Sequence, residues 1–163
     1  MIEIHTLQEH EREAVLALAP RLTVGVAPWR DPEAVGQAVE GWARDAVEAH
    51  HPRTAPVLVA VDDGAVVGFV AAGTRRHWSG ATDGSVGELV TARTAEGRGI
   101  GAALMAAAER WAVAQGCTRL TLETGAANTR AIAFYEHLGY VHEEVVLTRG
   151  LTTAEPRSRA DGT

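Results

Sequence analysis

The sequence has few of the residues on which several protein classes depend. Cys117 is the only cysteine among 163 residues, so an intrachain disulfide is excluded and a reducing compartment is expected. No hydrophobic run reaches the roughly 20 residues of a membrane-spanning helix, and the N-terminus has no basic flank before a long apolar segment. These features predict a cytoplasmic protein without a membrane partner.

Basic residues are also in the minority. Lys and Arg total 15 against 21 Asp and Glu, which gives a formal charge of −6. Binding to a phosphate backbone requires a clustered basic face, so no nucleic-acid partner is expected. The seven histidines show no metal-ligand spacing with a cysteine or a second nearby acid, and no metal is predicted. Ser85 has Asp83 where a serine-hydrolase elbow requires glycine, which argues against that class.

What is present is the pattern of one globular α/β (α+β) domain. Hydrophobic residues make up 46% and charged residues 22%, the balance of a folded, soluble chain. Helices are expected over 7–18, from Asp31 to about His50, and over 100–114 and 131–138. Strands are expected over 2–5, 57–61, 66–72, 86–91, 118–122 and 141–147, with a hairpin turn at 62–64. We predict a single domain over 1–151 with a mixed sheet, followed by a disordered polar tail over 152–163.

A glycine-rich segment, Glu96-Gly-Arg-Gly-Ile-Gly-Ala102, lies between the strand 86–91 and the helix 100–114. Closely spaced glycines let a ligand approach the backbone, and the unpaired N–H groups of a helix start bind anions. The segment therefore predicts a phosphate or diphosphate site, with a simple connecting turn as the alternative. A P-loop is excluded because no Lys-Ser/Thr pair follows the glycines.

A dinucleotide site is the second reading of the same segment. Gly97, Gly99 and Ala102 fit G-x-G-x-x-A, and Glu123 ends the next strand where a ribose-binding acid would be expected. Too few residues follow Ala102, however, for a second nucleotide-binding half. A dinucleotide site is therefore a less favoured interpretation of this segment than a site for the phosphate groups of a different cofactor.

A second motif follows downstream, and it resembles a known family. The segment from Asn128 to Tyr140, NTRAIAFYEHLGY, is similar to the signature N-x-x-A-x-x-F-Y-x-x-x-G-F/Y of the GNAT superfamily of N-acetyltransferases. The segment 88–101 resembles the acetyl-CoA loop Q/R-x-x-G-x-G/A of that family with its preceding strand. The resemblance spans about 86–140. It implies a mostly antiparallel sheet whose strands separate around acetyl-CoA. It also implies transfer of an acetyl group to a primary amine of a small molecule or peptide in a ternary complex. Pairing into a homodimer is a further expectation.

The resemblance also implies roles for individual residues. Tyr135 matches the general acid that protonates the coenzyme A thiolate, and a backbone N–H near Val90 or Thr91 would polarise the thioester. Asn128 would cap the last helix, bind the pantetheine arm, or both. The remaining cofactor-binding positions implied by the two motifs are Glu96, Gly97, Arg98, Gly99, Ile100, Gly101, Ala102 and Ala131.

Glu88 is the candidate general base, since burial in an otherwise apolar strand would raise the pKa of its carboxyl. The alternative for Glu88 is an ordinary strand residue that faces solvent. The alternative for Tyr135 is a residue that only packs against its neighbours. Trp29 and Trp78 lie in the two loops that flank the acceptor site in the family, which makes them candidate substrate contacts. The carboxylates of Asp31 and Asp83 would suit a cationic amine.

Glu96 departs from the family pattern, which has glutamine or arginine at this position. A carboxylate beside a dianionic ligand is unfavourable, so we expect Glu96 to turn to solvent or to pair with Arg93 or Arg98. On this view Glu96→Gln would bind the cofactor more tightly. A non-catalytic acetyl-CoA sensor is a further alternative, but such a module would not need Tyr135 and Glu88.

Overall fold

The computed structural model describes residues 1–151, and the predicted tail over 152–163 lies outside the described residues. Its centre is a five-stranded sheet in the order β1-β2-β3-β4-β5. The first four strands pair antiparallel, and β5 joins β4 in parallel. The strands span Ile2–Thr6, Val57–Asp62, Ala65–Arg76, Thr82–Thr91 and Leu120–Leu122.

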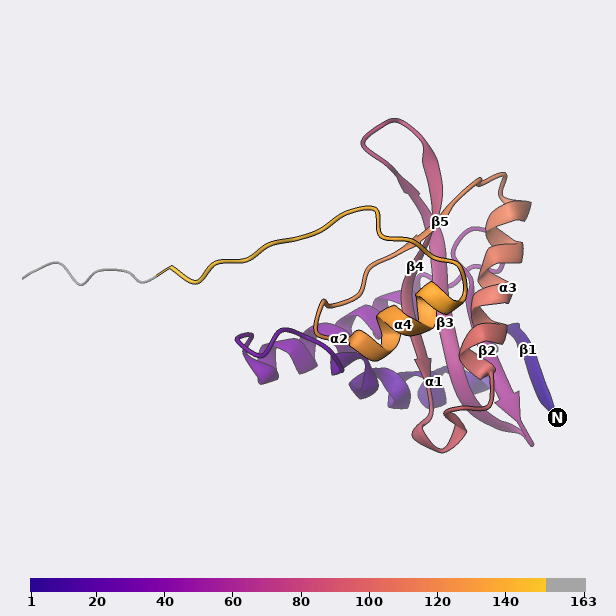
Figure 1. The fold of residues 1–163 in the computed structure, drawn as a ribbon. Coiled ribbons are helices and arrows are strands. Elements are labelled where there is room, and N and C mark those ends of the chain that lie inside the picture. Colours follow the sequence, from indigo (N-terminus) through magenta and orange to yellow (C-terminus); the bar gives the residue numbers. More distant parts are fainter. Residues whose placement is uncertain (152–163) are drawn as a thin grey trace, which may run out of the picture.

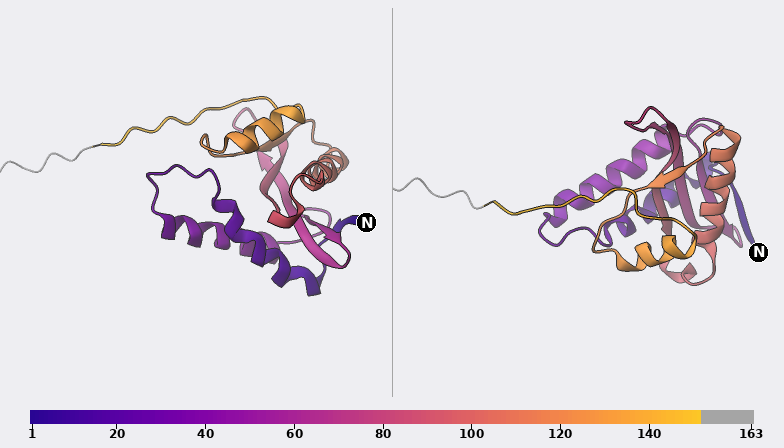
Figure 2. Two further views of the ribbon diagram at one scale, coloured as in Figure 1. Left: turned by 60° about the horizontal axis from the view of Figure 1, so that its bottom comes forward. Right: turned by 45° about the horizontal axis from the view of Figure 1, so that its top comes forward.

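Four helices cover the two faces of the sheet (Figures 1 and 2). Helices α1 (Arg12–Leu18) and α2 (Pro32–Glu48) pack on one face, and α3 (Ile100–Ala114) and α4 (Thr129–His137) lie on the other. Three short 3-10 turns, η1 (Glu9–Glu11), η2 (Ala19–Thr23) and η3 (Arg93–Ala95), connect these elements. The predicted α/β class and mixed sheet are thereby confirmed.

Local sequence explains where the main elements begin and turn. Asp31 caps α2, because its Oδ2 accepts a hydrogen bond from the Ala34 N–H at 2.8 Å, and Pro32 fills the first helical position. The β2–β3 hairpin turns at Asp63 and Gly64, which have φ values of 48° and 80°. Two consecutive positive φ values are what a tight hairpin turn requires.

Two buried clusters hold the layers together. On the α1/α2 face, Val15 and Ala43 pack against Phe69 and Val90, and on the other face Leu104 and Met105 pack against Val70. Apolar residues alternate along β2 and β3 between these two clusters, as expected for a sheet covered on both sides. The sheet is therefore a rigid support for groups at the β4–β5 edge.

Strands β4 and β5 run side by side for only three residues and then separate. Their pairing ends where Val86 faces Leu122, although β4 continues to Thr91. At the same point the β3–β4 register shifts, so that Gly87 has no partner between Val86 and Glu88. An extra residue of this kind bends a strand away from its neighbour. The divergence opens the sheet at the place where the candidate site lies.

The predicted closing strand over 141–147 is wrong. Residues 141–151 form no ladder with any described strand and lead away from the domain, beyond the end of α4 (Figure 1). Val145, Val146 and Leu147 are 75%, 89% and 90% exposed. The β-branched residues fit a strand, but in residues 1–151 no neighbouring strand pairs with them.

Candidate functional site

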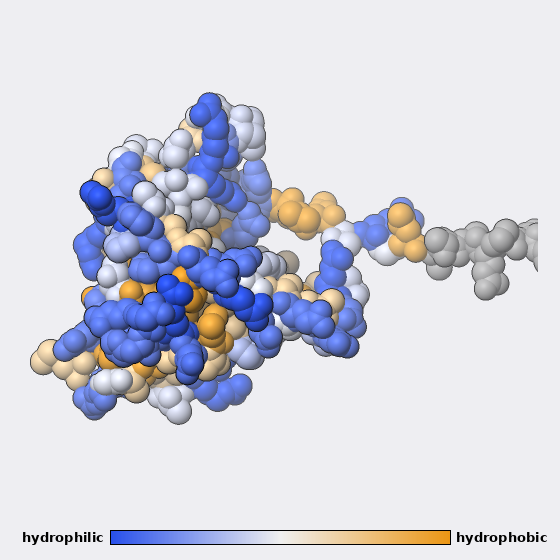
Figure 3. All heavy atoms as spheres, turned by 180° about the vertical axis from the view of Figure 1, so that it is seen from behind, coloured by the Kyte–Doolittle hydropathy of each residue, from blue (hydrophilic) through white to orange (hydrophobic). Residues whose placement is uncertain are grey.

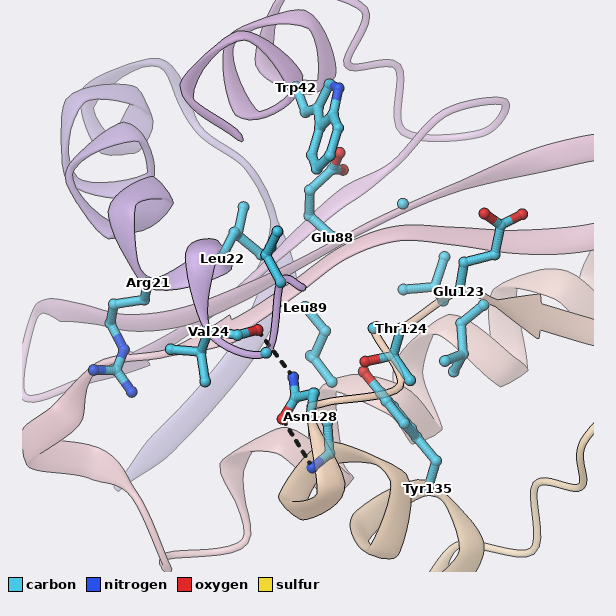
Figure 4. Close-up of a pocket in the computed structure, with 17 residues that line it drawn as sticks. Arg21, Leu22, Val24, Trp42, Glu88, Leu89, Glu123, Thr124, Asn128 and Tyr135 are labelled. Carbon is cyan, nitrogen blue, oxygen red and sulfur yellow. Dashed lines mark hydrogen bonds between the residues drawn. The ribbon is translucent and has the colours of Figure 1, made fainter. Parts of the chain in front are cut away.

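A cavity of about 600 Å³ lies between the diverging strands β4 and β5 (Figure 4). One side is formed by the loop that follows η2, and the other by α4 and the segment that precedes it. The cavity thus combines segments from the N-terminal and C-terminal parts of the chain. Its lining includes Leu22, Val24, Trp42, Glu88, Leu89, Glu123, Asn128, Ala131 and Tyr135.

The glycine loop before α3 has the geometry of an anion site. Gly97 and Gly99 have φ values of 74° and 77°, and a Cβ at either position would meet no atom within 4 Å, so the backbone is open to a ligand. Gly99 caps α3 without a side-chain acceptor, which leaves the N–H groups of the first turn available. These features fit the phosphate groups of a nucleotide cofactor. Ile100 is buried, so only its backbone can contribute.

The other predicted loop residues have different surroundings. Gly101 lies against α4, because a Cβ there would be 3.3 Å from Phe134 Cζ. Arg98 donates through Nη2 to Asp62 Oδ2 at 2.7 Å, and its guanidinium group is therefore held at the β2–β3 turn. Ala102 is partly buried in the first turn of α3. Thus Gly97, Gly99 and the start of α3 present their backbone, while Arg98 is engaged elsewhere.

Glu88 is in the cavity, and its environment favours the neutral acid. Burial and, as the smaller cause, the negative charge of Asp45 on α2 together raise the pKa of the Glu88 carboxyl to about 7. Trp42, one turn before Asp45, lies next to Glu88 (Figure 4). A carboxyl that titrates near neutral pH can accept a proton and release it again. The alternative of an ordinary solvent-facing strand residue does not account for this environment.

Tyr135 lies on the opposite side of the cavity, on α4 (Figure 4). Burial raises the pKa of its phenol above the usual value, so the hydroxyl stays protonated at neutral pH. The ring makes edge contacts with Phe134 and Tyr140 at centroid distances of 5.1 and 5.9 Å. Tyr135 therefore packs against its neighbours and also presents its hydroxyl to the cavity.

Asn128 connects the two sides of the cavity. Its Oδ1 accepts a hydrogen bond from the Ala131 N–H at 3.2 Å, which confirms the predicted cap of α4. Its Nδ2 donates to the Val24 carbonyl at 3.3 Å across the cavity. The two backbones approach so closely here that a Cβ on Gly25 would overlap Asn128, and one on Gly125 would overlap the Gly25 carbonyl.

The backbone of β4 presents specific groups to the gap. The Ala92 N–H donates to the Val67 carbonyl of β3 at 2.7 Å, and the direction of N–H groups alternates along a strand. Val90, which faces Phe69 in the ladder, therefore directs its N–H into the sheet. The backbone groups of Leu89 and Thr91 face the gap instead. Of the two residues predicted for this role, the structure directs Thr91 toward the gap.

Glu96 does not turn to solvent, nor does it pair with Arg93 or Arg98. Its carboxylate contacts Arg21 and Arg130, which come from η2 and from the first turn of α4. The two guanidinium groups lower the pKa of Glu96, with the hydrogen bond from Arg130 as the larger cause. The local pairing predicted from sequence was wrong because the fold brings distant arginines closer than the neighbouring ones.

The other residues predicted to contact the acceptor substrate do not line the cavity. Trp29 is 67% exposed, and Trp78 donates through Nε1 to Glu144 on the chain beyond α4. Asp31 serves as the α2 cap, and Asp83 is buried in β4. Trp42 and Asp45 take their place beside Glu88. Their spacing on one face of α2 is visible in the sequence, but nothing there links that face to β4.

Within residues 1–151, no group of three His, Cys, Asp or Glu side chains is arranged to hold a metal ion. None of the helices in this part of the chain is both long enough and apolar enough to cross a membrane.

The exposed face shown in Figure 3 carries mostly hydrophilic residues, with apolar ones gathered in small areas.

Comparison with known proteins identifies a family for this chain and several solved structures of similar fold. The model of the acetyltransferase (GNAT) family matches residues 21–140. Among solved structures, a provisionally assigned acetyl transferase from Pyrococcus furiosus is 19% identical, with a TM-score of 0.74, 93% of this chain covered and 100% of that one. The aminoglycoside 6'-N-acetyltransferase AAC(6')-Ig from Acinetobacter haemolyticus is 18% identical, with a TM-score of 0.66 and coverage of 93% and 99%. AAC(6')-Iy in complex with a CoA bisubstrate analog is 21% identical, with a TM-score of 0.68 and the same coverage.

Proposed function

The chain belongs to the acetyltransferase (GNAT) family, and from this premise we propose that it is an N-acetyltransferase that uses acetyl-CoA. One observation carries the proposal: Glu88 and Tyr135 line the same cavity from opposite sides, beside the gap between β4 and β5. The pKa of Glu88, raised to about 7, suits a base near neutral pH, and the raised pKa of Tyr135 keeps its phenol protonated as a proton source.

The cosubstrate would bind along the gap and the glycine loop. The open backbone at Gly97 and Gly99 and the first N–H groups of α3 would hold the diphosphate. The gap-facing backbone of Leu89 and the N–H group of Thr91 would bond the pantetheine arm, and Ala131 borders the same space. Acetyl-CoA supplies an activated thioester. A reducing compartment such as the cytoplasm suits the single, buried Cys117.

In the proposed reaction the acceptor amine must lose a proton before it attacks. Glu88 takes this proton, and its pKa of about 7 allows it to do so near neutral pH. The amine nitrogen forms a bond to the acetyl carbon as the carbon–sulfur bond breaks. Tyr135 then donates its phenolic proton to the departing thiolate and recovers one from solvent. An N–H group of β4 that faces the gap would stabilise negative charge on the carbonyl oxygen.

The acceptor proposed is a cationic primary amine. Asp45, and Glu88 when it is ionised, provide negative charge on the α2 side of the cavity, and the ring of Trp42 lies beside Glu88. Aromatic faces and carboxylates both attract ammonium groups. One of the similar structures is named as an aminoglycoside 6'-N-acetyltransferase, and aminoglycosides are cationic amines, which supports an acceptor of this charge type.

The first test is thermal stabilisation by acetyl-CoA, coenzyme A and NAD at matched concentrations. A ligand that binds only the folded chain raises its melting temperature. Acetyl-CoA and coenzyme A are expected to stabilise the protein and NAD is not. Stabilisation by NAD alone would instead support the dinucleotide site and reject the proposal.

Catalysis is then tested with a panel of cationic and neutral amines, with thiol release as the readout. Glu88→Gln is expected to lower kcat at least 10-fold, a typical loss for a general base, with little change in the affinity for coenzyme A. Glu123→Gln is the matched control, because Glu123 borders the same cavity but is 84% exposed. Equal kcat values for Glu88→Gln and the wild type would remove Glu88 from the mechanism. Stable binding of acetyl-CoA without turnover of any amine would support a sensor.

A further inference from the structure

Glu96 lies at the centre of a cluster that joins three distant segments of the chain. Its Oε1 accepts a hydrogen bond from Arg21 Nη2, and its Oε2 accepts one from Arg130 Nη1 at 2.9 Å. Arg21 also donates through Nε to the Thr91 carbonyl at the end of β4, at 2.7 Å. We call these three side chains the Arg21–Glu96–Arg130 cluster.

The charge of this cluster differs from what Glu96 alone suggests. Each carboxylate oxygen has its own guanidinium partner, and the pKa of Glu96 is lowered accordingly. Two guanidinium groups and one carboxylate leave a net positive charge. A guanidinium has five N–H donors, and the contacts above use only two on Arg21 and one on Arg130. Donors therefore remain for an anion.

The cluster borders the predicted anion site. Glu96 directly precedes Gly97, the first residue of the open glycine loop. Arg130 is in the first turn of α4, the helix that contacts Gly101 through Phe134. Arg21 approaches from η2 and lines the cavity. The two arginines thus flank the loop from opposite layers of the molecule.

We propose that Arg21 and Arg130 contact the cofactor diphosphate, and that Glu96 is a positioning residue that holds both guanidinium groups at the glycine loop. The inference rests on the proposed use of acetyl-CoA. Guanidinium groups bind phosphate oxygens with charge-assisted hydrogen bonds, and a fixed orientation reduces the entropy lost on binding. In this chain Arg21 and Arg130, which are distant in sequence, would supply the positive charge at the loop. Glu96 would not bind the diphosphate itself but would orient the two guanidinium groups.

The proposal reverses the sign expected for one substitution. If Glu96 acted only through its negative charge, Glu96→Gln would bind coenzyme A more tightly. If Glu96 positions the arginines, Glu96→Gln binds coenzyme A more weakly despite the gain of positive charge. The two ideas therefore make opposite predictions for the same variant.

The experiment measures coenzyme A dissociation constants by calorimetry for the wild type, Glu96→Gln, Arg130→Met and the double variant. Arg130 is 77% exposed in its side chain, so its substitution is not expected to disturb folding. Arg130→Met is expected to weaken binding about 10-fold, the lower end of the scale for a hydrogen bond to a charged group. Because Glu96 still holds Arg21 when Arg130 is replaced, the double variant is expected to bind more weakly than either single variant, but by less than the sum of the two losses in binding free energy. Arg93→Met, an exposed arginine of the same loop, is the matched control and should change affinity less than about 2-fold.

Two related ligands identify the phosphate group that is contacted. Dephospho-coenzyme A keeps the diphosphate and should show the same losses, whereas pantetheine has no diphosphate and should bind all variants equally. Tighter binding by Glu96→Gln, additive effects of the two substitutions, or losses confined to coenzyme A itself would overturn the inference. Failure of the wild type to bind coenzyme A would instead reject the proposed function, so the two failures are distinguishable.

Discussion

The raised pKa of Glu88 makes a prediction about stability as well as catalysis. The carboxyl titrates at about 7 in the folded chain and at about 4.5 when it is free of its surroundings. A raised folded-state pKa contributes stability that is complete below pH 4.5 and is lost as the pH rises through 7. From pH 5 to pH 8 the loss is about 2.5 kcal/mol for a fully desolvated carboxyl, and about 2 kcal/mol for this half-buried one.

Glu88→Gln removes the titration and keeps the size of the side chain. The variant is therefore expected to gain about 2 kcal/mol over the wild type between pH 5 and pH 8, while its turnover falls. Urea unfolding at four pH values in this range, followed by circular dichroism, measures the difference directly. Glu123→Gln, which is exposed, should follow the wild-type curve in parallel. Parallel curves for Glu88→Gln and the wild type would show that the carboxyl is not desolvated, and the base assignment would lose its physical support.

Three further predictions concern other parts of the molecule. Tyr135→Phe keeps the ring packing and is expected to lower kcat by about 10-fold or more without loss of stability, which steady-state kinetics and thermal unfolding together would check. Asn128→Ala is expected to cost about 1 to 2 kcal/mol in urea unfolding, because the α4 cap and the bond to Val24 are both lost, whereas Asn128→Asp should keep the cap. If two copies pair through the exposed chain beyond α4, the double substitution of Val145 and Leu147 by Lys will shift the protein to a monomer in light scattering, and an unchanged mass would exclude that pairing.

The regular elements were largely predictable from the sequence. The apolar spacing of α3 and the Asp31-Pro32 start of α2 depend on local backbone preferences, and the structure confirms both. The strand predicted over 141–147 fails for a physical reason. β-Branched residues such as Val141, Val145 and Val146 describe a chain that is able to pair, but they do not specify a partner strand.

The candidate site was predicted in part. Tyr135, Glu88 and Asn128 belong to motifs or stand out as polar groups among apolar ones, and the structure brings all three to one cavity. The partners of Glu96 were missed because they are 75 and 34 residues away in sequence. Trp42 was missed because only the packing of α2 on the sheet places it beside β4. Contacts between distant segments have no local signal in a single sequence.

The close contact of the Gly25 loop with Gly125 and Asn128 also limits how this protein can change its acceptor during evolution. Neither loop has room for a larger residue at these positions unless the other loop moves, and Asn128 at the same contact caps α4. The two loops must therefore change together or not at all. New acceptor preferences are expected to arise first at Trp42, which borders the cavity from α2 and has no part in this contact.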